Sequence, residues 1–107
     1  MANLVQMMKQ AQEMQGKMQQ MQERVGQTEV VGQSGGGMVT LVMTGRSQVR
    51  KIKIDPKLVN PAEIEMLEDL IVAAANDAKT KADALVAGET EKMMGGLNLP
   101  PGFKLPF

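Results

Sequence analysis

The sequence of 107 residues contains no cysteine, histidine, tryptophan or tyrosine. Without cysteine and histidine it lacks the thiolate nucleophile, the commonest general base and the usual zinc ligands. It also lacks the glycine-rich patterns of nucleotide-binding loops and the serine elbow of hydrolases. We therefore do not expect an enzyme, and we expect no cofactor, no metal site and no small-molecule substrate.

Aromatic residues are almost absent, since the only two are Phe103 and Phe107. RRM and OB domains stack bases on aromatic side chains, so this scarcity argues against those modes of nucleic-acid binding. No apolar run approaches the roughly 18 residues of a membrane span, and the N-terminus has no apolar core of signal-peptide length. The absence of cysteine fits a reducing compartment. We expect a soluble, cytoplasmic protein with no membrane partner.

Two long helices are predicted, one at each end of the folded part. Residues 2–25 place apolar side chains in alternating steps of three and four, an a/d heptad pattern with many glutamines between them. Asn60, Pro61 and Glu63 form the signature of a helix start, and the two glycines from Gly95 stop that helix after residue 94. The two apolar seams are Leu4, Met7, Ala11, Met14, Met18, Met21 and Val25, and Ile64, Leu67, Ile71, Ala74, Ala78, Ala82 and Leu85.

Between the helices the apolar period changes to that of β-strands. The segments TEVV, MVTLVMT and QVRKIKI are separated by the turn segments GQSGGG and GRS, which predicts a three-stranded antiparallel meander. The fold class is therefore α+β, in the order α-β-β-β-α, as a single domain over residues 1–94. The remaining residues 95–107 are rich in glycine and proline and are interpreted as a flexible tail.

The lengths of these elements predict an assembly. A helix of more than twenty residues is longer than a six-residue strand, so both helices overhang the sheet and carry their apolar seams with them. An apolar seam in water is unfavourable. The helices must therefore pair with each other, with a second subunit or with both, and a homodimer with protruding helical arms is the simplest geometry that fits the pattern.

The net charge of zero, from twelve basic and twelve acidic side chains, conceals a segregation. Residues 46–57 contain one acidic side chain, Asp55, whereas residues 61–94 are acidic overall. The basic side chains of the short segment are Arg46, Arg50, Lys51, Lys53 and Lys57. A chain with no net charge thus has a local concentration of positive charge on its third strand.

Strict alternation divides this strand into two faces. Val49, Lys51 and Lys53 share one face, and Arg50, Ile52 and Ile54 share the other. Two interpretations stay open. The isoleucines point to the core while the lysines solubilise the other face or guard an edge strand, or the basic residues form an anion-binding stripe that a two-fold axis would double.

The helices offer a second set of cations. Lys9 and Lys17 lie on the first helix and Lys79 and Lys81 on the last, where they would line a gap between two arms. Ordinary solvated helix faces explain the same residues. Six methionines fall within the first 21 residues, either as adaptable core filler or as a surface suited to varied partners.

The chain resembles the bacterial YbaB/EbfC nucleoid-associated proteins over almost its whole length. The segments that carry the resemblance are LVQMMKQAQEMQGKMQQMQ, GGGMVTLVMTG, VRKIKIDP, EDLIVAAANDAKTKA and GGLNLPPGFKLPF. They occur in order, and their combination is more specific than any one of them. The doubled proline in PPGF, where PGGF is expected, is the one departure.

This resemblance implies a tweezer-like homodimer that binds double-stranded DNA with low or broad sequence specificity and associates with the nucleoid. In the family the DNA contacts are attributed to the two helices, which carries over to Lys9, Lys17, Arg24, Lys79 and Lys81. Arg46, Arg50, Lys51 and Lys53 of the strand region stay as further candidates. The alternative is a protein-interaction module whose methionine-rich helices grip a partner helix, so that the association with DNA is indirect.

Overall fold

The computed structural model describes residues 3–95, which form two helices and a small sheet. The elements are α1 (Asn3–Gln27), β1 (Glu29–Ser34), β2 (Val39–Thr44), β3 (Val49–Ile54) and α2 (Ile64–Gly95). Short 3-10 turns occupy Gly35–Gly37, Pro56–Leu58 and Pro61–Glu63. The predicted α+β order is confirmed. The predicted tail lies, apart from Gly95, outside the described residues.

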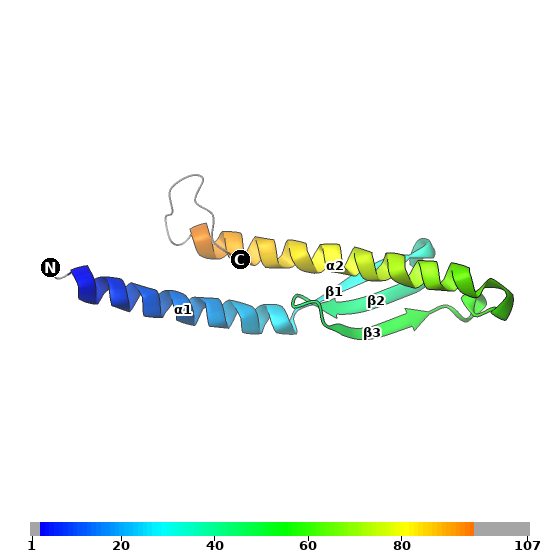
Figure 1. Cartoon of the computed structure of the whole chain (residues 1–107), viewed down its shortest axis with the longest axis horizontal. Helices are drawn as coiled ribbons and strands as arrows, with labels where there is room; N and C mark the ends of the chain where they lie inside the picture. Colours follow the sequence, from blue (N-terminus) through cyan, green and yellow to red (C-terminus); the bar gives the residue numbers. More distant parts are fainter. Residues whose placement is uncertain (1–2, 96–107) are drawn as a thin grey trace.

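The molecule is elongated, with extents of 73 × 25 × 16 Å. Its radius of gyration is 19.8 Å, whereas a compact chain of this length has a radius of about 13 Å. Figure 1 shows why: α2 runs along the sheet and past its end, and α1 extends away from that same end. The helices therefore overhang the sheet, as their lengths predict.

The sheet is antiparallel with the strand order β1-β2-β3, and α2 packs against β1 and β2. Small side chains on α2 let the helix lie close to the strands, where the larger side chains of β2 fill the space between the two layers. The buried core consists of Val39, Leu41, Met43, Leu58, Ala74, Ala78 and Ala82.

The first strand is longer than the sequence pattern predicts. The turn was expected to begin at Gly32, but β1 continues through Ser34. A Cβ atom at Gly32 would come within 3.0 Å of backbone atoms of Ala74 and Ala78 on α2. Glycine is thus present at this position for close packing of helix and sheet. The turn itself is made by Gly35–Gly37, whose φ angles of +59°, +66° and +92° suit glycine alone.

A register shift changes the faces of β3. The shift between Val42 and Met43 pairs Met43 with Val49. Because cross-strand partners share a face, Val49 lies on the side of the sheet that α2 covers, and strict alternation was wrong for this residue. Ile52 pairs with Leu41 on that side, yet it stays 42% exposed and Val49 57% exposed, because α2 lies over β1 and β2.

The start of the last helix follows the predicted capping signature. The side-chain oxygen of Asn60 accepts a hydrogen bond of 3.0 Å from the backbone N–H of Ala62. A 3-10 turn follows over Pro61–Glu63, so the α-helix proper begins at Ile64. Among the helices of residues 3–95, none combines the length and the apolar character that crossing a membrane requires.

Candidate nucleic-acid interface

The basic side chains of the described residues fall into two groups. Four of them lie within 4.0 Å of a carboxylate, namely Arg24, Lys79, Lys81 and Lys92. The second group has no carboxylate within that distance in residues 3–95, and consists of Lys9, Lys17, Arg46, Arg50, Lys51, Lys53 and Lys57. The candidate cations thus divide into those that already form an ion pair within the fold and those that do not.

Lys81 closes the free edge of the sheet. Its Nζ donates to the carbonyl oxygen of Val31 on β1 at 2.8 Å and lies 3.1 Å from Oδ2 of Asp77. The same carboxylate accepts a 3.0 Å hydrogen bond from the backbone N–H of Gln33. These two side chains of α2 thus satisfy backbone groups that an edge strand leaves open. Lys81 lies over the sheet and has a structural role there.

Asp77 should make the stability of the fold depend on pH. The hydrogen bond from the Gln33 N–H and then that from Lys81 hold the pKa of Asp77 below its ordinary value of 3.8. The folded state therefore favours the carboxylate, so its contribution is fully present above that ordinary pKa and is lost as the pH falls through the lowered pKa. Thermal unfolding between pH 6 and pH 2 should show Asp77→Asn losing less stability toward acid than the wild type, and equal acid sensitivity would contradict the contact.

Lys79 ties α2 to the turn between β2 and β3. Its Nζ donates to Oγ of Ser47 at 2.8 Å and to Oδ1 of Asp83 at 2.9 Å. Lys79 therefore lies beside the sheet, as Lys81 does. The structure brings neither lysine to the gap between the overhanging parts of the two helices.

Arg24 joins the two helices. Its Nη2 lies 2.6 Å from Oε2 of Glu89, and Nζ of Lys92 lies 3.9 Å from the other oxygen of the same carboxylate. The contact lies in the last turn of α1. Arg24 is thus occupied in holding α1 against α2.

Arg50 and Arg46 lie against the C-terminal end of α1. Nη2 of Arg50 donates a long hydrogen bond of 3.4 Å to the carbonyl oxygen of Gly26. The side chain of Arg46 lies beside the same residue, where a Cβ on Gly26 would meet its Cδ at 3.0 Å. Cations are favourable at this end of a helix because of the helix dipole. Both arginines are therefore placed to stabilise the junction of α1 with the sheet.

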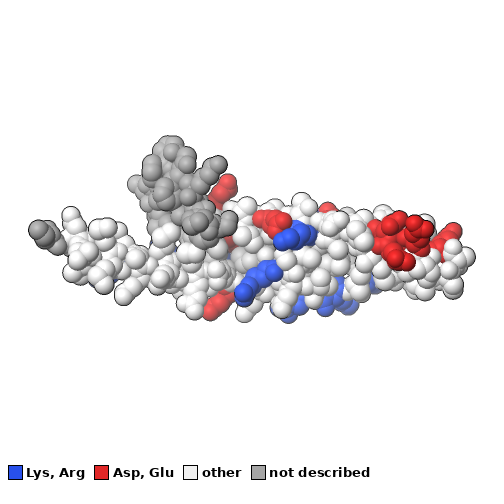
Figure 2. All heavy atoms as spheres, in the orientation of Figure 1, with Lys and Arg blue, Asp and Glu red and all other residues white. Residues whose placement is uncertain are grey.

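Lys51 and Lys53 remain on the open face of the sheet. They pair with Val42 and Thr40, whose side chains point away from the face that α2 covers. Side chains two residues apart on a strand are about 7 Å apart. We name the exposed residues Arg46, Lys51, Lys53 and Lys57, which follow one another along β3 and its two ends, the basic strip. Figure 2 shows blue side chains gathered on this side and red ones where α2 begins.

Lys9 and Lys17 lie on the exposed part of α1. The two lysines are eight positions apart, which corresponds to about 12 Å along the helix axis. Each is solvated, and they belong to the arm that extends beyond the sheet (Figure 1). They therefore form a second candidate contact surface, separate from the basic strip.

Some of these ion pairs could have been predicted from the sequence. Asp77 with Lys81 and Lys79 with Asp83 are spaced by four residues, the spacing at which helical side chains meet. The ion pair of Arg24 with Glu89 joins residues 65 positions apart, and no local pattern reveals it.

Comparison with known proteins agrees with this architecture. The model of the YbaB/EbfC DNA-binding family matches residues 1–97. The chain is 58% identical to a nucleoid-associated protein of Paramagnetospirillum magneticum and 55% identical to one of Granulibacter bethesdensis, in each case over the full length of both chains. A crystal structure of an uncharacterized protein from Helicobacter pylori has the same fold, with a TM-score of 0.76 at 23% identity, covering 85% of this chain and 96% of that one.

Proposed function

The chain belongs to the YbaB/EbfC DNA-binding family, and from this premise we propose that it binds double-stranded DNA by contacts to phosphates, with little reading of the bases. The relatives are named nucleoid-associated proteins, so its place in the cell is the nucleoid. The family is a DNA-binding family and not an enzyme family.

The basic strip is the observation that carries this proposal. Lys51 and Lys53 are exposed, adjacent on one face and not paired with a carboxylate in the described part of the chain. Phosphate binding needs clustered charge on one surface more than a basic total. Lys9 and Lys17 on α1 supply further phosphate contacts from the arm. Arg24, Lys79 and Lys81 contribute less, because DNA would have to displace their carboxylate partners.

The proposed binding unit is a homodimer, tweezer-like in shape. A single chain leaves the seam of α1 in solvent at Leu4 and Met7, and Val49 and Ile52 uncovered on the sheet. Burying such surfaces in a second copy is favourable, and a two-fold axis doubles the number of cations that one DNA segment meets. Sedimentation velocity should give about twice the chain mass of 11.6 kDa.

Low sequence specificity follows from the chemistry of the strip. Phosphate contacts carry no sequence information directly, and lysines without aromatic neighbours offer little base recognition. In a fluorescence-anisotropy titration of a labelled duplex, unrelated duplexes of equal length should therefore compete equally. A duplex that competes at least ten-fold better than the others would contradict this part of the proposal.

A second candidate is favoured by one observation. Leu4, Met7 and Met8 near the start of α1 are 67%, 63% and 60% exposed, a flexible apolar surface that suits a partner helix. Under this alternative the purified protein would bind no duplex even at low salt, yet would associate with DNA in the presence of its protein partner.

A further inference from the structure

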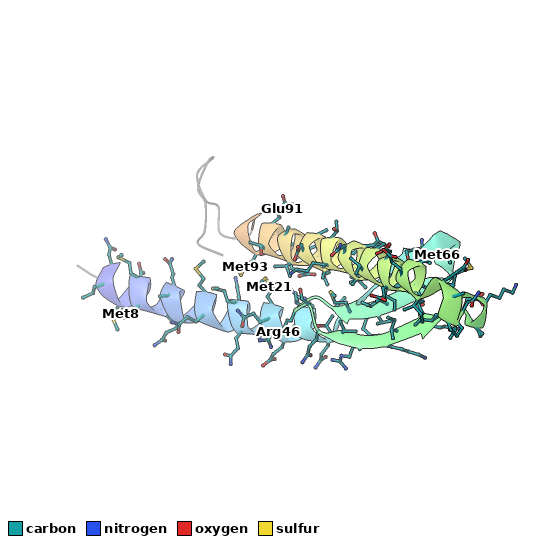
Figure 3. All side chains as sticks on the ribbon, turned by 45° about the vertical axis from the view of Figure 1, so that its right-hand side comes forward. Met8, Met21, Arg46, Met66, Glu91 and Met93 are labelled. Carbon is teal, nitrogen blue, oxygen red and sulfur yellow. The ribbon has the colours of Figure 1, made fainter. Side chains whose placement is uncertain are left out.

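A cleft of about 360 Å³ lies between α1 and α2, beside the turn from β2 to β3. Its walls are Met21 and Val25 of α1 and Val86 and Thr90 of α2, and Gly45 and Arg46 close one end. In Figure 3 the side chains of Met21 and Met93 point into the space between the two helices. The volume falls within the range of about 300 to 1,000 Å³ that ligand pockets occupy. The chain thus has a mostly apolar cleft between its two arms.

We propose that the chain's own C-terminal segment, residues 97–107, binds in this cleft and inserts a phenylalanine between α1 and α2. The segment contains both aromatic residues of the protein, Phe103 and Phe107, together with three leucines. Sulfur atoms of methionine make favourable contacts with aromatic rings, and unbranched methionine adapts to the shape of what it meets. The C-terminal segment and the lining of the cleft are therefore both apolar and suit each other.

The C-terminal segment begins close to the cleft, because it directly follows α2. The helix that forms one wall ends at Gly95, about 8 Å along its axis beyond Thr90. Twelve further residues follow Gly95, and an extended chain of that length reaches up to about 40 Å. Three prolines at positions 100, 101 and 106 restrict the unbound segment, which lowers the entropy lost on docking. The segment is long enough to turn back and enter the cleft.

Binding of the C-terminal segment in the cleft would hold α1 in place against α2. The ion pair of Arg24 with Glu89 joins the two helices, and both residues are chain neighbours of residues that line the cleft. A phenylalanine that touches both helices would add an apolar contact at the point where α1 leaves the body of the molecule. The segment would then fix the direction of α1, and this role does not depend on the DNA-binding proposal.

Hydrogen exchange followed by mass spectrometry tests the proposal without DNA. The full chain is compared with a chain that ends after Gly96, and the exchange rate is followed in peptides covering residues 15–25 and 85–93. Removing the segment should raise both rates about five-fold, the effect of losing roughly one kcal/mol. Phe103→Ser combined with Phe107→Ser should do the same in the full chain, whereas Lys104→Ser should leave the rates unchanged.

A substitution in the cleft provides a second, independent test. Thr90→Lys keeps a good helix former and fills the cleft with a long side chain, so truncation in this background should no longer change either rate. Unchanged rates on truncation of the wild type would overturn the proposal. An equal rise in a peptide covering β2 would also overturn it, because it indicates global destabilisation. Protection that grows with protein concentration would assign the cleft to a second copy instead.

Discussion

Replacing Gly32 with alanine is expected to lower the free energy of unfolding by about 3 kcal/mol, the upper part of the usual cost of overpacking. The added Cβ would lie within 3.0 Å of backbone atoms of Ala74 and Ala78. A backbone cannot turn aside as a flexible side chain can, so α2 would have to move away from β1. This movement would open the contact that buries Leu41 in the core. Denaturant unfolding followed by circular dichroism measures the loss.

Gly16→Ala is the matched control for this substitution. A Cβ at Gly16, on the exposed part of α1, meets no atom within 4 Å. Alanine inside a helix is favoured over glycine by roughly 0.5 to 1 kcal/mol. We therefore expect the control to be neutral or slightly stabilising. Equal stability of Gly32→Ala and the wild type would contradict the close approach of α2 to β1.

Substituting both sheet lysines, Lys51→Gln with Lys53→Gln, is expected to weaken DNA binding about 100-fold. A dimer loses four cations by this change, and an exposed charge contact contributes on the order of 0.7 kcal/mol, which sums to nearly two factors of ten in the dissociation constant. Both side chains point away from the face that α2 covers, so the fold should remain intact. Anisotropy titration with a labelled duplex measures the change, and circular dichroism checks the fold.

A control with the same change of net charge distinguishes DNA contact through the basic strip from DNA contact through α2. Lys79→Gln with Lys92→Gln also removes two cations from each chain, but both lysines lie beside carboxylates. We expect DNA affinity to fall by no more than about three-fold, since these cations are already compensated. If this pair weakens binding as much as the sheet pair does, the contact surface lies on α2 and the basic strip is not the principal contact.

The sequence predicted those features of the fold that rest on local periodicity and capping. The heptad seam from Leu4 to Val25 predicted α1, and Asn60 marked the approach to α2. Both signals are local, because residues three or four positions apart lie on the same face of a helix. The overhang of the helices followed from length alone.

Features that depend on tertiary contact were not accessible in this way. Gly32 resembled a turn glycine, because the helix backbone that passes over it is more than forty residues away in the chain. The register shift that moves Val49 to the other face leaves no mark in an alternating strand. Likewise, Arg24 was a candidate for DNA contact until its distant partner Glu89 was located. In the candidate site, long-range pairing thus engages Arg24, whereas Lys79 and Lys81 pair with carboxylates four residues away on the same helix.

The salt dependence of DNA binding tests the central proposal most directly. The association constant is measured by anisotropy at several salt concentrations between 50 and 300 mM, with the dimer mass checked at each. If phosphate contacts from the four sheet lysines of a dimer carry the affinity, the logarithm of this constant should fall linearly with the logarithm of the salt concentration, with a slope of about −3.6 or steeper. A slope near zero, or no binding at 50 mM salt, would contradict the account.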